Sequence, residues 1–355
     1  RRDGEIVVNE RRARVTAVDA IPWPARHLID LKSYNEHSLV NGVRAGMTVP
    51  ILATRGCPYQ CTYCSSPTMW TTRWYPRDPV DVANEITHYV KTYGARNFPF
   101  QDLTAIIKKD WIVTFCNELI KRQLDVVWQF PSGTRCEVID DEVADLLARS
   151  GGRHLAFAPE SGSGNTRKLI KKKMTTEGLF RAIDASVRHK LNVTAFLVIG
   201  FPHDTREDIA ETVKFVRRLA RKGIDDIAIG FYFPIPNTAI YKDLVTKGRV
   251  DYSDKCLMTP IFANDERLRP ENNYCDHLTA SQLTRTKYWL LLNFYPLSFL
   301  FHPTRIFHLI GNVIRGRETR KLETFLIELK RKSLLWIKTK LRIGTKDDSA
   351  VSMPR

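Results

Sequence analysis

Six short apolar segments, each followed by a helical segment, constrain the fold of this chain more strongly than any other feature. The apolar segments do not alternate strictly between apolar and polar residues, which is typical of strands buried on both faces of a parallel sheet. Parallel strands joined by helices form either a (β/α) barrel, complete or partial, or a doubly wound open sheet. The expected strands are residues 49–54, 96–100, 125–130, 154–159, 192–200 and 225–233.

The segments between the strands carry signals for where helices start and stop. Asp78 is a natural N-cap, and Pro79 fits the first helical position after it. Thr205 and Asp208 form a capping-box pattern, and Gly223 supplies the stop of the same helix. The expected helices start near Asp78 and cover residues 109–122, 140–150, 176–189, 205–222 and 238–247. This order of elements predicts an α/β fold.

Polar and reactive residues follow the expected strands within a few positions. In parallel α/β folds, the loops after the carboxyl ends of the strands carry the functional residues. The residues in these places are Cys57, Asp102, Ser132, Glu160, Gly200 and Pro234. We therefore expect one functional site at this end of the sheet.

Three cysteines, Cys57, Cys61 and Cys64, are spaced C-x3-C-x2-C. A compact turn with this spacing can aim three thiolates at a [4Fe–4S] cluster and leave the fourth iron to a non-protein ligand. A zinc site is the alternative, but it needs a fourth Cys or His at short range, and the next His along the chain, His88, is 24 residues on and expected in mid-helix. The scattered Cys116, Cys136, Cys256 and Cys275 do not make a disulfide framework. We read them as buried apolar residues, with a radical-quenching thiol among them as the alternative.

The stretch CPYQCTYC resembles the cluster loop of radical S-adenosylmethionine enzymes, with Tyr63 as the aromatic residue before the last cysteine. The resemblance implies a partial (β/α)6 TIM-like barrel. It also implies a [4Fe–4S] cluster on Cys57, Cys61 and Cys64, with S-adenosylmethionine on the fourth iron. In that family the cofactor is cleaved to a 5′-deoxyadenosyl radical, which abstracts hydrogen from a substrate.

The resemblance extends over residues 50–250 and suggests cofactor contacts on four further strands. FPFQDLT lies where the family contacts the methionine amino group, although Gln101 and Asp102 replace the usual Gly-Gly-Glu. Ser132 and Arg135 in FPSGTRCE are expected as cofactor neighbours.

FAPESGS and LVIGFP match two later motifs of the same family. Glu160 is the expected ribose ligand, because a carboxylate accepts hydrogen bonds from both hydroxyls. Gly200 and Pro202 belong to the segment that lies against adenine, where glycine permits a close approach. Each of these residues, considered alone, also has an interpretation without a cofactor. Glu160 is then a carboxylate at the start of a helix, Asp102 is a cap, and Gly200-Phe201-Pro202 is a common turn.

The stretch NERRARVTAVDAIPWPARHLIDL, residues 9–31, resembles the Pro-rich connector that follows the cobalamin-binding domain in one branch of the family. That branch methylates carbons or forms rings, so cobalamin is a further expected cofactor, but no residue here is assigned to it. The upstream domain is absent and position 1 is not Met, so we expect a fragment, or alternatively a lineage that lost the domain. The expected units are the connector 1–48, the barrel 49–252 and a helical, basic extension 253–355.

The net charge of +16 indicates an anionic partner, although a merely basic surface is the alternative. Eleven Lys or Arg against three Glu fall within residues 315–346, after an aromatic-rich segment expected to be helical over 279–314. This extension predicts either peripheral contact with an anionic membrane, which suits a lipid substrate, or a helical cap on the barrel.

The remaining expectations concern partners, location and chemistry. We expect a small-molecule or lipid substrate, an electron donor such as flavodoxin or ferredoxin, and a cytoplasmic protein. A radical enzyme that modifies RNA is an alternative, but no RNA-binding module is present and we do not expect a nucleic-acid partner. A non-catalytic iron–sulfur or zinc protein would leave Glu160 and Gly200 unexplained. No residue is assigned as a general acid or base.

Overall fold

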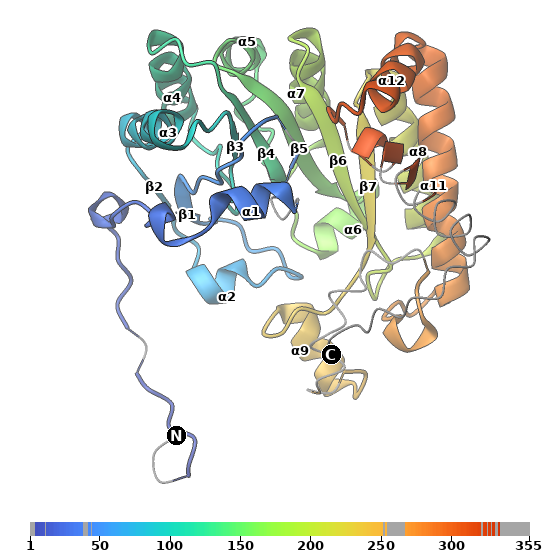
Figure 1. Ribbon diagram of the computed structural model, residues 1–355. Helices are drawn as coiled ribbons and strands as arrows, with labels where there is room; N and C mark the ends of the chain where they lie inside the picture. Colours follow the sequence, from blue (N-terminus) through green and yellow to red (C-terminus); the bar gives the residue numbers. More distant parts are fainter. Residues whose placement is uncertain are drawn as a thin grey trace, which may run out of the picture.

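The computed structural model describes residues 4–10, 12–37, 42–43, 45–250, 253, 267–320, 322–324, 326–327, 329–330 and 333. Its centre is a parallel five-stranded sheet in the order β3-β4-β5-β6-β7 (Figure 1). The strands are β3 (Asn97–Pro99), β4 (Val127–Thr134), β5 (Gly152–Glu160), β6 (Asn192–Ile199) and β7 (Asp226–Phe231). Each strand pairs with the next along the chain, which confirms the predicted order and the α/β class.

The first expected strand is divided into two parts. Thr48 and Ile51 make isolated parallel bridges to β3, and the amides of Val49 and Ile51 donate to β3 carbonyls at 2.9 and 3.0 Å. Pro50 lies between these donors, so its nitrogen faces the open edge, where no hydrogen bond is lost. The chain then turns into β1 (Thr54–Gly56), which pairs antiparallel with β2 (Trp74–Pro76). Six chain segments therefore form the partial barrel.

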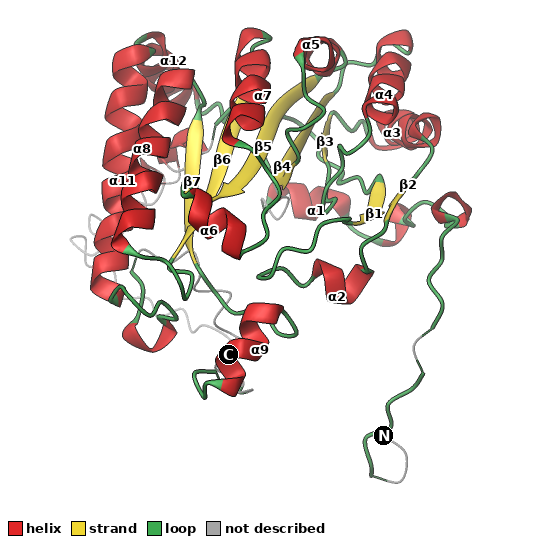
Figure 2. Ribbon diagram, turned by 180° about the vertical axis from the view of Figure 1, so that it is seen from behind, coloured by secondary structure: helices red, strands yellow, loops and turns green. Residues whose placement is uncertain are grey.

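Helices cover the outer face of this sheet (Figures 1 and 2). Their caps agree with the sequence: Asp78 accepts from the Val80 amide, Thr205 and Asp208 form the capping box, and Gly223 ends its helix in the left-handed conformation. Large aromatic side chains such as Trp128, Phe100 and Phe115 are fully buried between sheet and helices. The helices are α3 (Pro79–Tyr93), α4 (Lys109–Lys121), α5 (Asp141–Arg149), α7 (Thr176–Arg188) and α8 (Arg206–Lys222).

Three shorter helices follow β1, β5 and β7, and a fourth precedes the sheet. Most of them lie at the carboxyl ends of the strands, at the bottom of Figure 1. They are α1 (Leu31–Glu36), α2 (Ser66–Trp70), α6 (Gly164–Leu169) and α9 (Ala239–Thr246), with 3-10 turns at Val18–Ala20, Arg26–Leu28 and Pro270–Asn272.

The connector before the barrel lies on the first strand and on α3. The Trp23 indole donates to Asp81 at 3.2 Å, and the Arg26 guanidinium donates to the Pro50 carbonyl at 2.6 Å. These contacts agree with an extended segment laid on a surface. The boundaries at 48/49 and 252/253 stay predictions, and Cys256 lies outside the described residues.

Two helices of the C-terminal extension continue the outer layer past β7. In α11 (Ala280–Phe301), Leu283, Leu290 and Phe294 are fully buried, and this helix packs along α8. This packing agrees with the helical-cap alternative. The helix α12 (Thr304–Arg315) follows, and most of the basic segment after it lies outside the described residues. No helix in the described part of the chain is both long and apolar enough to span a membrane.

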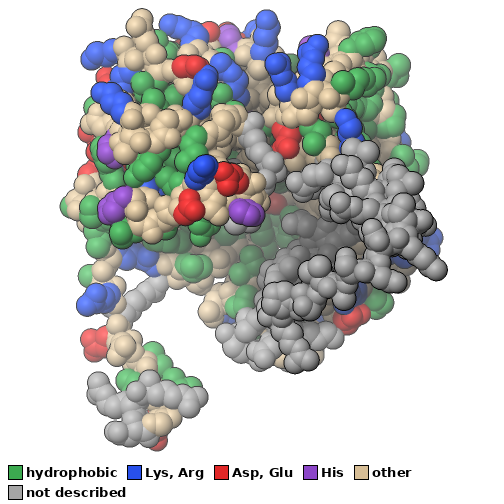
Figure 3. All heavy atoms as spheres, in the orientation of Figure 1, with side chains coloured by type: hydrophobic (Ala, Val, Ile, Leu, Met, Phe, Trp, Pro, Cys, Tyr) green, Lys and Arg blue, Asp and Glu red, His purple; other side chains and the backbone are tan. Residues whose placement is uncertain are grey.

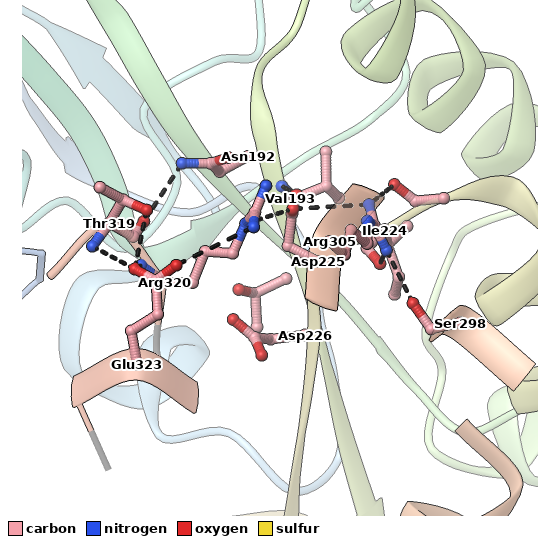
Figure 4. A network of polar contacts seen from close by, with 12 residues as sticks. Asn192, Val193, Ile224, Asp225, Asp226, Ser298, Arg305, Thr319, Arg320 and Glu323 are labelled. Carbon is pink, nitrogen blue, oxygen red and sulfur yellow. Dashed lines mark hydrogen bonds and ion pairs between the residues drawn. The ribbon is translucent and has the colours of Figure 1, made fainter. Parts of the chain in front are cut away.

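A charged network joins this extension to the amino-terminal ends of β6 and β7 (Figure 4). The buried carboxylate of Asp225 forms an ion pair with Arg320 at 2.8 Å and accepts from Arg305 at 3.4 Å. Arg305 also donates to the Ser298 hydroxyl at 2.8 Å, and Asn192 donates to the Thr319 carbonyl at 3.2 Å. The network fixes α12 and the residues after it at the end of the barrel away from the cysteines.

The Gly162 position in the ESGS motif tests how tightly the loop after β5 packs. A Cβ atom there would lie 2.5 Å from Phe215 Cβ and 2.6 Å from Thr212 Cα of α8. We predict that Gly162→Ala lowers the free energy of unfolding by about 1–3 kcal/mol, because the backbone of α8 cannot yield.

Gly164, the first residue of α6, is the matched control, since a Cβ there meets no atom within 4 Å. Gly164→Ala should change the unfolding free energy by no more than about 1 kcal/mol. Urea titration of both variants measures the difference, and equal stability of the two would contradict this packing.

Candidate cofactor site

The cysteine loop connects β1 to α2 and is clamped on two sides by its backbone. The Thr62 amide donates to the Ile170 carbonyl just after α6 at 3.1 Å, and the Ile240 amide of α9 donates to the Thr62 carbonyl at 3.2 Å. Tyr63 packs into a small apolar cluster beside the main core. The members of that cluster are Ile170, Phe201, Tyr232, Tyr241, Leu244, Val250 and Tyr274. The loop is therefore placed by segments far away in the sequence.

The three thiols lie in a partly buried, electropositive environment. Cys61 is buried, and Cys57 and Cys64 are half-buried. Burial raises the pKa of the Cys57 thiol, while the Tyr59 amide and the cations of Arg135 and Lys172 act in the opposite direction. Burial likewise raises the pKa of Cys64, against the Ser66 amide, which donates to its sulfur at 3.4 Å.

Amide hydrogen bonds and nearby cations favour the thiolate, which is the form that binds iron. The donor set therefore fits a cluster. In the described part of the chain, no three Cys, His, Asp or Glu side chains are grouped for a single metal ion. The assignment of Cys57, Cys61 and Cys64 to a cluster stays a prediction based on their spacing and surroundings.

Glu160 stands at the carboxyl end of β5 beside the cysteine loop. Its φ of +64° is a strained conformation for a residue with a side chain, and such strain is concentrated at functional sites. Its Oε1 accepts from the Tyr63 hydroxyl at 2.7 Å and from Lys172 Nζ at 3.0 Å. Burial, reinforced by the Glu160 carboxylate, raises the pKa of Tyr63 well above its ordinary value. Two predicted site residues are thus brought together with a lysine.

Lys172 is a site residue that the sequence analysis did not find. Its side chain and that of Glu160 are each about 10% exposed, so the ion pair is nearly buried. Its charge also acts on Cys57 and Cys64. The available signal was the run Lys171-Lys172-Lys173 after the ESGS motif, but such a run does not indicate which lysine turns inward.

Asp102 is committed to the protein's own backbone. Its carboxylate accepts from the Ala53 amide at 3.2 Å and from the Thr54 hydroxyl at 2.6 Å, and it also accepts from the Thr54 amide. These bonds fix the start of β1, three residues before Cys57. The geometry thus gives Asp102 a positioning role, and its expected contact with the cofactor stays a prediction.

Gly200 and Pro202 form a turn that Asp204 closes. The amides of Gly200 and Phe201 donate to Asp204 Oδ2 at 2.8 and 3.0 Å. Gly200 has φ +88°, and a Cβ there would lie 2.9 Å from Leu283 of α11. The glycine is thus required by backbone conformation and by helix packing. Pro202 is buried, and its carbonyl accepts from the Asp276 amide at 2.9 Å.

The remaining predicted residues fall into two places. Ser132 donates to Gln101 Oε1 at 3.4 Å, and both side chains are exposed at neighbouring strand ends. Arg135 is buried, donates to Glu137 at 3.0 Å and lies 3.8 Å from the centre of the Tyr59 ring. Arg135 therefore contacts the cysteine loop through an aromatic ring.

The model of the radical SAM superfamily matches residues 51–216, which span the cysteine loop, Glu160 and the Gly200 turn. Residues 51–216 form a radical SAM domain. This confirms the expected family and the fold class. The [4Fe–4S] cluster and S-adenosylmethionine are the cofactors of that family.

Curated relatives of the radical SAM domain include methyltransferases and cyclases. An uncharacterized methyltransferase of Pyrococcus horikoshii is 24% identical over 82% of this chain and 60% of its own length. The anaerobic magnesium-protoporphyrin IX monomethyl ester cyclase of Rubrivivax gelatinosus is 27% identical over 76% of this chain and 47% of its own length. The chain therefore spans about half the length of the curated relatives it matches.

Solved structures share the fold of the domain. The cobalamin-dependent S-adenosylmethionine radical enzyme OxsB, solved with aqua-cobalamin and S-adenosylmethionine, matches 81% of this chain and 50% of its own chain. Its TM-score is 0.52 at 13% identity. The methyltransferase TsrM of Kitasatospora setae matches 62% of this chain and 41% of its own, with a TM-score of 0.51 at 17% identity.

Asp102 and Asp204 allow a matched test of how the radical SAM domain fixes its loops. Backbone amides bind both oxygens of Asp102, so an amide nitrogen placed there would face a donor. At Asp204 both amides bind Oδ2, and the Thr166 hydroxyl donates to Oδ1. An Asn side chain can keep its oxygen at the Oδ2 position and place its nitrogen at Oδ1, where the Thr166 hydroxyl can accept from it. We predict that Asp102→Asn is less stable than Asp204→Asn by about 1–3 kcal/mol in urea unfolding at pH 7. Equal stability would contradict these roles.

The pH dependence of stability gives a second test at Asp204. Burial raises the pKa of this carboxyl from 3.8 to about 6. The folded protein thus holds the proton more tightly than the unfolded chain. The tighter binding adds about 3 kcal/mol to the free energy of unfolding below about pH 4, and this addition is lost as the pH rises through about 6. Asp204→Asn cannot titrate, so its unfolding free energy should fall less between pH 4 and pH 7 than that of the wild type. If the unfolding free energy of Asp204→Asn falls as much between pH 4 and pH 7 as that of the wild type, the raised pKa of Asp204 is contradicted.

Proposed function

We propose that this chain is the catalytic part of a cobalamin-dependent radical SAM enzyme that methylates a carbon or closes a ring on an organic substrate. The observation that carries the proposal is the cysteine loop, which is clamped beside the strained Glu160 and its partner Lys172. The names of the relatives support the choice of methylation or cyclisation.

Different residues of this chain would bind the cluster and the parts of S-adenosylmethionine. Cys57, Cys61 and Cys64 would hold the [4Fe–4S] cluster. The cluster supplies the single electron that breaks the sulfonium bond of S-adenosylmethionine. Glu160 would accept from the ribose through Oε2, since Tyr63 and Lys172 both occupy Oε1.

Other side chains prepare the site without touching the reacting atoms. Lys172 neutralises Glu160 in a nearly buried place, where an unpaired carboxylate would be costly. Gln101 and Ser132 are exposed at the strand ends and would contact the methionine part. Arg135 supports the loop through Tyr59. The backbone at Gly200 and Pro202 would lie along adenine.

The substrate is proposed only as a class. The relatives act on a magnesium-protoporphyrin ester and on a cytidylyl phosphonate, and both are large organic molecules. The lipid alternative finds its support in α12, where Phe307 is 76% exposed and Ile314 is 70% exposed on an otherwise basic extension. We also propose, without a structural test, that the enzyme uses cobalamin, that its extension contacts an anionic membrane peripherally, and that it is located in the cytoplasm.

Removing any one cluster ligand should abolish cleavage of S-adenosylmethionine. We predict that Cys57→Ala, Cys61→Ala and Cys64→Ala each form no 5′-deoxyadenosine after iron reconstitution and reduction with dithionite. The control is Cys116→Ala, because Cys116 is fully buried in α4 and far from the cysteine loop. Chromatographic quantification of 5′-deoxyadenosine measures the result. Product from a loop variant at the control's level would refute the assignment.

A further inference from the structure

A basic rim surrounds the outside of the cysteine loop. We define it as Arg167 and Lys168 of α6 together with Lys171, Lys172 and Lys173 in the loop between α6 and α7. Two adjoining hollows, of about 660 and 370 Å³, are lined by this rim and by Tyr59 of the cysteine loop. Positive charge is therefore concentrated at the surface that lies next to the thiols.

The backbone of the rim is in direct contact with the cysteine loop. The Cys61 thiol points to the Lys171 carbonyl, with 3.9 Å between sulfur and oxygen. The neighbouring Ile170 carbonyl accepts from the Thr62 amide. A protein bound to the lysine side chains would thus be separated from the cysteine loop by little more than one stretch of backbone.

Three rim lysines form no ion pair with any acidic residue that the structure describes. They are Lys168, Lys171 and Lys173, and all three are exposed. Lys and Arg also gather along the upper edge of Figure 3, at the opposite end of the barrel. Basic residues at that end include paired ones, such as Arg149 with Asp145 at 3.2 Å. What distinguishes the three rim lysines is therefore their place beside the cysteine loop.

We propose that the basic rim is the docking surface for a small acidic protein that carries one electron. This inference rests on the proposed function, which requires one electron at the cysteine loop. The carrier would be oxidised by one electron while the cluster is reduced by one, and no bond forms or breaks in this step.

The shape and charge of the surface favour a protein over a small anion. Pockets for small molecules are enclosed, whereas these hollows are open, and each is lined by five Arg or Lys side chains, with Glu137 as the one acidic residue in the larger hollow. Electron-transfer complexes use small, transient interfaces in which complementary charge sets the association rate. A row of free lysines beside the redox centre suits such an interface.

Direct binding gives the first test and needs no cluster. Flavodoxin is the probe, titrated by calorimetry into the wild type and into the triple variant Lys168→Glu, Lys171→Glu, Lys173→Glu. We expect binding at least about tenfold weaker in this variant at low ionic strength, with the difference shrinking as salt is raised. Equal affinity at low salt overturns the proposal and leaves the rim to a small anion.

The matched control reverses three exposed lysines away from the rim. Lys91, Lys190 and Lys214 are exposed and form no ion pair with another described residue, so Lys91→Glu, Lys190→Glu, Lys214→Glu changes the net charge equally. Its flavodoxin affinity should stay within about twofold of the wild type. A loss as large as that of the rim variant would show that net charge alone is responsible, and would overturn the proposal.

Cleavage of S-adenosylmethionine with two reductants gives the second test. With dithionite, the rim variant and the wild type should form 5′-deoxyadenosine at the same rate. With reduced flavodoxin, the rim variant should be at least about tenfold slower. A loss with both reductants would place the lysines in the cofactor site and overturn docking. No product from the wild type with dithionite would refute the proposed function, while the binding titration would still decide the docking surface.

Discussion

Two backbone hydrogen bonds at Thr62 determine where the cysteine loop lies, and the rest of the site depends on them. One comes from the segment after α6 and the other from the start of α9, so the loop is bound to both the β5 and the β7 ends of the sheet. Each such bond contributes only about 1 kcal/mol to stability, but together with the packing of Tyr63 they select one loop position. Because Cys57, Cys61 and Cys64 are on the same loop, their thiols are placed by these contacts as well.

Electrostatics at the site follow from the same placement. Burial works against charged thiols and carboxylates, and two cations offset it: Arg135 over Tyr59, and Lys172 against Glu160. Glu160 has a strained φ, and Gly162, two residues further on, packs directly on α8. The charged network at Asp225 joins α12 and the segment after it to the opposite end of the barrel.

Much of this arrangement could be predicted from local sequence signals. Apolar segments, caps such as Asp78 and the cysteine spacing act over a few residues, and the structure confirms the strand order and the helix caps. Signals that depend on long-range contacts were missed. Lys172 turns inward directly after Lys171, which has φ +54°, and Asp204 closes a turn whose backbone amides the sequence does not reveal. Asp102 accepts hydrogen bonds from Ala53 and Thr54, a contact that the sequence does not indicate, and its place near the cofactor stays a prediction.

The central claim is that three cysteines hold a cluster whose fourth iron binds S-adenosylmethionine. Electron paramagnetic resonance of the reconstituted, reduced protein tests it most directly. The account predicts the signal of a reduced [4Fe–4S] cluster whose g values shift when S-adenosylmethionine is added. A cluster signal that S-adenosylmethionine leaves unchanged, or a chain that retains zinc and takes up no iron, would contradict it.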